Sequence, residues 1–501
     1  MSKNLATFMS GRLLTLAIVL AFQIMLVRLL SPREYALYAV VFAVAALMQT
    51  SVSFGIQRVI AKYFTKVGWT LSFATVRRLA YRLIIFRAAA SAGLMALTYG
   101  GARLVGLVPA LDAWLVLISA AFIWVLLVQM DADAMAQALA LQPLSRACSV
   151  GEAAARLLFV GALALSGGPL TAAQVIGVAA LTFGSAAVVL LTFVLRGLSS
   201  SAEAGDERPL DWSELRKTGL SGYAASLAWF TSSPAVIRLI AGARLPLGTF
   251  AGFAFAQTLV TSFQRYTPGS LLLPFVEPVA MRDLDRTGDL GRFEAVLSLL
   301  SKIDIALIGA AIVGTGVAGE ALVTLMTGGK YADQAFALPW LLAYIMATSI
   351  YRSFEIGAVA LGATSALVRT LSVSLVWLGI AVLLTERFGL VALLVCPVCD
   401  ALCRIGALYR DLARRGVRHV VDLAVVGTAL GLMISVTVLG RVVNYELAPG
   451  MIGRIAIGTF AGVTYMALLA TIRPMRATEL ELVARQSPGR AATALASLAR
   501  P

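Results

Sequence analysis

The sequence predicts an all-α integral membrane protein, and three observations lead to this fold class. Of the 501 residues, 59% are apolar and only 13% are charged, with a mean hydropathy of +0.87. An average soluble domain is about 45–50% apolar and about 25% charged. Apolar runs of bilayer-spanning length, about 20 residues each, recur along the whole chain. Basic residues gather in alternate loops between these runs, which is typical of polytopic membrane proteins.

Hydropathy predicts about 14 transmembrane helices. The first apolar run follows Lys3 and Arg12 and is too long for a signal-peptide core, so we expect it to be retained as a span. The outward loops are short, which leaves no extracytoplasmic domain for a catalytic site. The expected spans are 13–30, 35–57, 83–106, 113–138, 147–166, 172–195, 218–241, 247–274, 303–326, 335–361, 368–384, 390–408, 423–439 and 452–472.

The charge distribution predicts that both termini are cytoplasmic. Lys and Arg total 41 and Asp and Glu total 26, a net charge of 41 − 26 = +15. If the N-terminus lies inside and the spans alternate, most basic residues fall in cytoplasmic segments, as the positive-inside rule requires. The excess charge is expected to meet anionic lipid head groups. Nucleic acid is not expected as a partner, because no basic domain interleaved with aromatic residues is present.

A polar segment rich in Ser, Ala, Glu, Gly and Asp separates the first six spans from the other eight. This composition is typical of a linker. The tail after Ile472 is rich in Ala and Arg and is expected to be partly disordered. The predicted organisation is a six-helix lobe at 1–198, a cytoplasmic linker at 199–217, a second six-helix lobe at 218–410, two additional helices at 411–472 and a cytoplasmic tail at 473–501.

The two lobes share a sequence pattern that suggests a six-span repeat. Arg28 ends the first span and Gln57-Arg58 ends the second; Arg238 lies in the seventh and Gln264-Arg265 in the eighth. The separations are similar, 58 − 28 = 30 and 265 − 238 = 27 residues. Internal repeats of this kind are common in transporters.

The same four residues, Arg28, Arg58, Arg238 and Arg265, are the predicted substrate-binding residues. An Arg at bilayer depth costs about 2.5–3.5 kcal/mol on insertion scales, so it is retained where it faces a cavity, a partner or an anion. Guanidinium groups bind phosphate through two parallel hydrogen bonds and remain charged. We therefore expect a cationic cavity for a substrate bearing a diphosphate or carboxylate. Arg265, placed within the eighth span, is expected to be the most sensitive to substitution, whereas Arg28 and Arg58 lie near span ends and could also reach the interface.

Intramembrane acids are candidates for proton or sodium coupling. Asp131 and Asp133 are preferred, because neither has a basic residue one helical turn away. Glu152 and Arg156 are four residues apart and are expected to form an ion pair.

Other chemistry has little support in the sequence. With one His, a multi-His metal site or a His-based triad cannot be built, and Cys396 and Cys399 form a C-x-x-C pattern without the flanking elements of a redox site. Buried helical thiols are expected instead. Neither a catalytic site, a metal site nor a cofactor is predicted.

Several motifs resemble the Wzx-type polysaccharide repeat-unit flippases. They are VRLLSPREY at 27–35, GIQR at 55–58, GGKYA at 328–332 and FGLVA at 388–392. Ala36 stands where the family pattern usually has Gly. The resemblance runs over almost the whole chain, and the order of the motifs agrees with the expected spans.

The resemblance implies the multidrug/oligosaccharidyl-lipid/polysaccharide exporter fold: two six-helix lobes around a central cavity plus two C-terminal helices. It also implies alternating-access transport of undecaprenyl-diphosphate-linked oligosaccharides across the bacterial inner membrane, with membrane lipids and polysaccharide polymerase or export machinery as partners. Two alternatives stay open. One is a cation-coupled drug or metabolite antiporter of the same superfamily, although the expected first span has no carboxylate and Glu34 alone lies near the second. The other is a membrane glycan polymerase or ligase.

Overall fold

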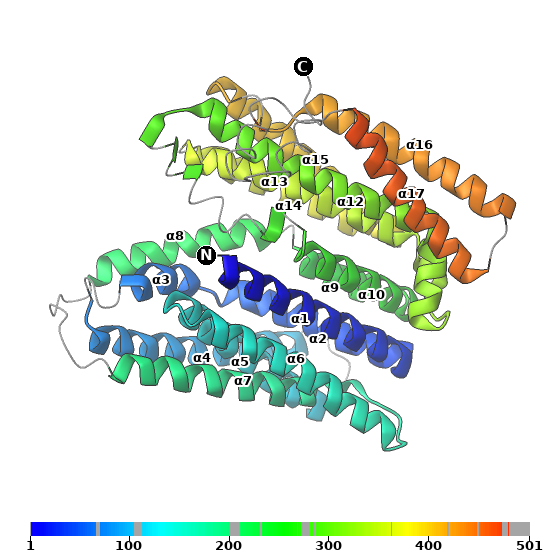
Figure 1. Ribbon diagram of the computed structural model, residues 1–501. Helices are drawn as coiled ribbons and strands as arrows, with labels where there is room; N and C mark the ends of the chain where they lie inside the picture. The colour runs from blue at the N-terminus through cyan, green and yellow to red at the C-terminus, as the bar shows by residue number, and fades with distance from the viewer. Residues whose placement is uncertain are drawn as a thin grey trace. The chain divides into compact units, whose positions relative to one another are not determined.

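The structure is a computed structural model of the whole chain. Its description covers residues 2–66, 71–104, 113–200, 211–230, 233–267, 269–271, 280–281, 283–284, 286–361, 363–417, 420–447, 450–472 and 479. These residues form an almost entirely helical protein (Figure 1). Eleven of the described helices are long and apolar enough to cross a membrane, so the predicted all-α membrane fold class is confirmed.

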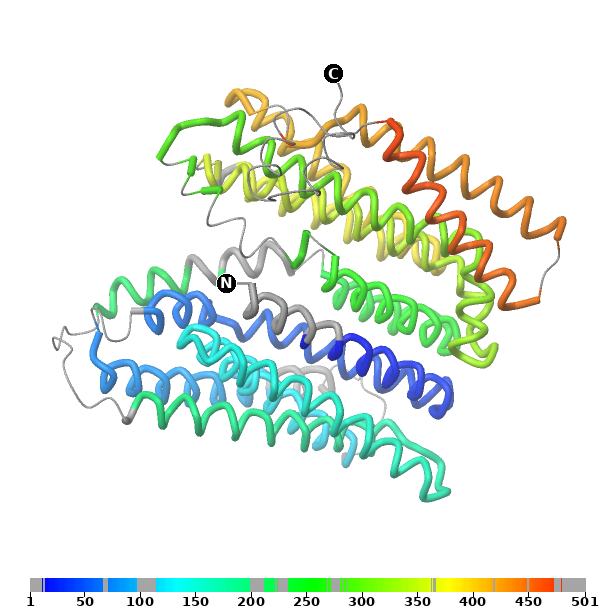
Figure 2. Tube along the Cα trace, in the orientation of Figure 1, coloured from blue at the N-terminus to red at the C-terminus, as the bar shows by residue number. Residues whose placement is uncertain are grey.

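The chain divides into two compact units, Met1–Gly242 (unit 1) and Ala243–Pro501 (unit 2). The described helices of unit 1 are α1 (Ser2–Leu29), α2 (Pro32–Ser51), α3 (Ile56–Tyr63), α4 (Phe73–Leu104), α5 (Ala113–Ala138), α6 (Gln142–Leu165), α7 (Ala172–Ser200), α8 (Trp212–Phe230) and α9 (Pro234–Arg244), which reaches the boundary. Those of unit 2 are α10 (Leu247–Gln264), α12 (Leu290–Thr327), α13 (Ala337–Ala360), α14 (Thr364–Phe388), α15 (Leu390–Arg414), α16 (Leu423–Leu447) and α17 (Met451–Thr471). Figure 2 traces the same path along the chain.

The core of unit 1 forms where α5 packs along α7 and α1 packs along α6 (Figure 1). The predicted seventh span, 218–241, is divided in the structure, since α8 ends at Phe230 and α9 begins at Pro234. Proline is favoured in the first turn of a helix, because the N–H groups there have no carbonyl partner within the helix and a residue without an N–H loses no hydrogen bond. α8 packs against α3, where Lys62 Nζ lies 2.7 Å from Glu214 Oε1. The boundary between the units, after Gly242, falls inside the last turn of α9, and the predicted lobes with a linker at 199–217 stay a prediction.

The predicted second span, 35–57, is also shorter in the structure. α2 ends at Ser51, and α3 begins after Gly55, which has a φ of 70°. A side chain at Gly55 would also run into the backbone of Gly219, so both the conformation and the space require glycine there. Gln57 and Arg58 consequently open a separate short helix instead of ending a span.

Unit 2 is built around the long helix α12, with α17 lying along it (Figure 1). Gly458 and Gly462 of α17 approach α12 so closely that a side chain at either would run into Ala318 or Ala310. Such close approach of small residues is a common way for membrane helices to associate. Beyond α12, Gly328 and Gly329 both adopt positive φ and turn the chain toward Tyr331, which is buried. The GGKYA motif thus has a structural role, and burial raises the pKa of Tyr331 to about 12.

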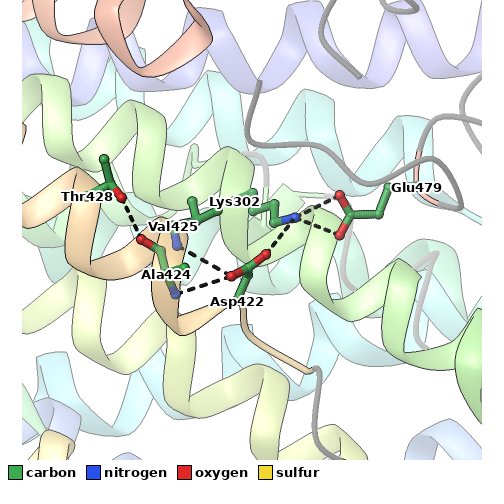
Figure 3. Close-up of polar contacts among 6 residues, drawn as sticks. All are labelled: Lys302, Asp422, Ala424, Val425, Thr428 and Glu479. Carbon is green, nitrogen blue, oxygen red and sulfur yellow. Dashed lines mark hydrogen bonds and ion pairs between the residues drawn. The ribbon is translucent and has the colours of Figure 1, made fainter. Parts of the chain in front are cut away.

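A buried ion cluster joins α12 to the chain that follows α17 (Figure 3). Lys302 Nζ lies 2.8 Å from Glu479 Oε2 and 3.8 Å from Asp422 Oδ2. Asp422 also accepts backbone hydrogen bonds from Ala424 and Val425 and so caps the start of α16. Glu479 belongs to the tail that was expected to be partly disordered, and its side chain is buried in this cluster. Most of the tail lies outside the described residues.

The four cysteines, Cys148, Cys396, Cys399 and Cys403, are all free thiols, but the expectation of buried helical thiols holds for Cys396 alone among those on α15, since Cys399 is half-buried and Cys403 is exposed. Cys396 and Cys399 lie on the helix α15 around Pro397. No group of His, Cys, Asp and Glu in the described part of the chain is arranged to hold a metal ion.

Candidate substrate site

Unit 1 contains a cluster of polar and charged side chains that converge on Tyr38, and we call it the Tyr38 cluster. Its members are Gln23 on α1, Tyr38 on α2, Glu152 and Arg156 on α6, and Arg238 on α9. Tyr38 is 4% exposed and its hydroxyl hydrogen-bonds the Gln23 side chain. Arg156 and Arg238 both lie close enough to act on that hydroxyl electrostatically.

Arg156 occupies an aromatic setting within this cluster. Its guanidinium lies 5.0 Å from the ring centroids of both Phe22 and Phe183. It also forms the predicted ion pair with Glu152, with 3.0 Å between Arg156 Nη2 and Glu152 Oε1. Cation–π contacts and one carboxylate together stabilise a charge that is largely removed from water. This pair is where the sequence predicted it, but its position beside Tyr38 was not foreseen.

Arg238, one of the four predicted substrate-binding residues, is placed beside Tyr35 and Tyr38. The helix that carries it begins at Pro234, with the Ser233 hydroxyl accepting the Val236 N–H at 3.4 Å. One turn of helix later, Arg238 faces α2. The Tyr38 cluster therefore has two guanidinium groups and one carboxylate, a positive excess suited to an anionic group.

The other three predicted Arg residues lie in different surroundings. Arg28 is an exposed residue in the last turn of α1, and Arg58 is an exposed residue on α3. The expectation that Arg265 lies within the eighth span is wrong, because α10 ends at Gln264 and Arg265 is the exposed residue that caps it. Three of the four thus belong to unit 1 and Arg265 to unit 2, and a common cavity remains a prediction.

The two predicted coupling acids differ in their surroundings. Asp131 on α5 is 1% exposed, and its Oδ2 lies 3.5 Å from Nε of Arg87, a residue of α4. Among the described residues, neither oxygen of Asp131 accepts a hydrogen bond. Asp133 accepts hydrogen bonds from Ser145 and from Gln137, the latter at 2.7 Å.

Arg87 is a functional candidate that the sequence analysis missed. Its side chain is 1% exposed and pairs with Asp131. Its position 14 residues into a long apolar helix (87 − 73 = 14) is the signal that could have identified it. Glu34, in contrast, is explained by local structure, because its carboxylate accepts the backbone N–H of Ala172 at 2.6 Å at the start of α7.

Comparison with known proteins supports the fold. No protein-family model matches the sequence, and neither does any curated protein. Among solved structures, the chain is similar to one described as lipid II flippase MurJ in an inward closed conformation. The TM-score is 0.66 at 10% sequence identity, and the match covers 93% of this chain and 99% of that chain.

A mutant of the MATE transporter VcmN from Vibrio cholerae is also similar, with a TM-score of 0.48 and 16% identity over 82% of this chain and 96% of that chain. The match to the flippase extends over nearly the full length of both chains. The chain therefore has the fold of the multi-pass membrane flippase MurJ.

Proposed function

We propose that this protein is a flippase for lipid-linked oligosaccharides, which carries undecaprenyl-diphosphate-linked repeat units across the bacterial inner membrane for surface polysaccharide synthesis. The observation that carries the proposal is the Tyr38 cluster, which presents Arg238 and Arg156 beside two tyrosines inside one lobe of a flippase fold. The protein acts as a transporter and not as an enzyme in this proposal, and it needs no cofactor. Polysaccharide polymerase and export machinery are proposed as partners.

The chemistry of the Tyr38 cluster fits a diphosphate better than a cationic drug. Guanidinium groups match phosphate oxygens in geometry, and Tyr hydroxyls can donate further hydrogen bonds to them. A cationic drug would instead need an uncompensated carboxylate, but Glu152 of the Tyr38 cluster is already paired with Arg156. Alternating access would expose the bound diphosphate and glycan to each side in turn while the lipid chain stays in the bilayer.

Translocation by the purified protein tests this proposal. Proteoliposomes would receive undecaprenyl diphosphate bearing a labelled oligosaccharide, and glycan crossing the bilayer would be measured with an impermeant glycosidase. We expect transport by the wild type and loss of transport in Arg238→Ala. Arg454→Ala, an exposed Arg on α17, is the matched control and should transport normally.

Two results would contradict the proposal. Wild-type proteoliposomes that exchange cationic drugs for protons but do not move the lipid-linked glycan would identify an antiporter. Polymerisation or transfer of the labelled sugar by the purified protein would identify a membrane enzyme.

A further inference from the structure

In each unit, a buried ionisable side chain among the described residues bonds the backbone at or just beyond the end of a helix, α2 in unit 1 and α10 in unit 2. In unit 1, Arg87 of α4 donates a hydrogen bond to the carbonyl oxygen of Val52, the residue that caps α2. In unit 2, a carboxylate oxygen of Asp304 on α12 accepts the N–H of Gly269 at 2.8 Å, just beyond the end of α10. The Arg87 and Asp304 side chains are 1% and 5% exposed.

The two contacts occupy the same place in their units. Val52 and Arg87 are 35 residues apart, and so are Gly269 and Asp304. Arg87 follows the first residue of α4 by 87 − 73 = 14 positions, and Asp304 follows the first residue of α12 by 304 − 290 = 14. This agreement supports the six-span repeat independently of the Arg pattern from which the repeat was predicted.

The next helix of each unit supplies a second partner at nearly the same separation. Arg87 pairs with Asp131 of α5, 131 − 87 = 44 residues later. Asp304 receives a hydrogen bond from the Ser349 side chain of α13, 349 − 304 = 45 residues later. Each holding side chain therefore joins three segments of its unit: the end of α2, α4 and α5 in unit 1, and the chain just beyond α10, α12 and α13 in unit 2.

The opposite charges of the two holding residues follow from the backbone groups they meet. Val52 offers a carbonyl at the C-terminal end of α2, where the helix dipole is negative and a cation is favoured. Gly269 offers an N–H, which a carboxylate accepts strongly. The space at Gly269 is fitted to this contact, because a side chain there would run into the Asp304 carboxylate.

We propose that Arg87 and Asp304 are equivalent positioning residues, which hold the segments that carry Arg58 and Arg265 for the substrate. Arg58 follows Val52 by 58 − 52 = 6 residues, and Arg265 precedes Gly269 by 269 − 265 = 4. Each guanidinium group can meet a phosphate reproducibly only if the segment that carries it is fixed. The functional part of this inference rests on the proposed transport of a diphosphate lipid, whereas the positioning itself does not.

In unit 2, variants that keep or remove the backbone contact distinguish a positioning role of Asp304 from a role of its negative charge. Asp304→Asn keeps an oxygen that accepts the Gly269 N–H, so we expect lipid-linked glycan transport within about twofold of the wild type. Asp304→Ala removes the acceptor, and Gly269→Ala displaces it; each should reduce transport at least tenfold. Ser301→Ala is the matched control, since Ser301 is buried one turn earlier on α12 and bonds Ser353.

In unit 1, spin-label distances report on the segment directly. With the four native cysteines replaced by alanine, labels at Gln57 and Ala74, both exposed, would measure the distance from α3 to α4. The double variant Arg87→Met/Asp131→Asn removes the contact without leaving a buried charge unpaired. We expect it to broaden or shift the distance distribution, whereas Ser91→Ala, one turn along α4, should leave the distribution unchanged.

The results that would overturn the inference differ from those that would overturn the proposed function. Equal loss of transport in Asp304→Asn and Asp304→Ala would show that the charge matters and not the backbone contact. Normal transport in both, or an unchanged label distance in the double variant, would also reject positioning. If the wild type moved no glycan, the proposed function would fail, but the label distances would still decide whether Arg87 holds the segment.

Discussion

The ion cluster around Lys302 makes a quantitative prediction about the attachment of the C-terminal tail. Lys302 Nζ lies 2.9 and 2.8 Å from the two carboxylate oxygens of Glu479, and Lys302 and Glu479 are 5% and 0% exposed (Figure 3). Glu479→Gln removes one carboxylate but leaves Lys302 paired with Asp422. A hydrogen bond to a charged group contributes about 1.5–3 kcal/mol, so we expect the free energy of unfolding to fall by about that amount.

Substitution of the cation, Lys302, should lower the free energy of unfolding by more than substitution of Glu479. Lys302→Met removes the cation that lies beside the carboxylates of Asp422 and Glu479, and breaking a buried ion pair costs about 3–5 kcal/mol. Adding Glu479→Gln to Lys302→Met removes one of these charges and should restore part of the stability. The two substitutions should therefore be strongly non-additive, as expected for groups in direct contact.

Thermal unfolding of the detergent-purified protein, followed for the two single variants and the double variant, measures this coupling. Glu446→Gln is the control, because it removes an exposed carboxylate from α16 and should leave the melting temperature unchanged. An unchanged melting temperature in Glu479→Gln would refute the reasoning. Additive losses in the double variant would do so as well.

The remaining predictions concern topology, coupling and one substrate residue. Reporter fusions at Ser201 and at the C-terminus should both read cytoplasmic, and a periplasmic signal at either would overturn the orientation. If an ion gradient drives transport, Asn at Asp131 or Asp133 should abolish gradient-dependent transport in proteoliposomes; unchanged coupling with both acids replaced would remove them as candidates. Arg265→Ala should abolish polysaccharide export at normal expression and Arg265→Lys should retain part of it, because Lys keeps the charge but not the planar fork. Full export by Arg265→Ala would reject a role for Arg265 in substrate binding.

Much of the fold could be predicted because membrane spans are specified locally. A span must be apolar over its own length, so a single sequence reveals it. The breaks inside the apolar runs were harder to predict, because they depend on backbone conformation and on neighbours. The end of α2 at Ser51 and the start of α9 at Pro234 fall inside runs that remain apolar on both sides. Gly55 and Pro234 were the local signals for these breaks.

The candidate site was predicted less completely, because its members come together through tertiary packing. The Glu152–Arg156 pair could be predicted from a spacing of four residues on one helix. The pairing of Arg87 with Asp131 joins two helices and could not be predicted from spacing. The position of Arg238 near Tyr38 also depends on two different helices, α9 and α2, and could not be predicted from spacing either. Glu479 lies beyond the last span, where composition alone favoured disorder.

The affinity of the purified protein for undecaprenyl diphosphate, compared with undecaprenyl monophosphate, tests the central claim most directly. Arg238→Ala removes a charge-assisted contact of about 1.5–3 kcal/mol, which corresponds to a loss of about tenfold or more in affinity. We therefore predict that the wild type prefers the diphosphate and that Arg238→Ala binds it at least tenfold more weakly, whereas Arg454→Ala binds like the wild type. Equal affinity of the wild type and Arg238→Ala for the diphosphate would contradict the account.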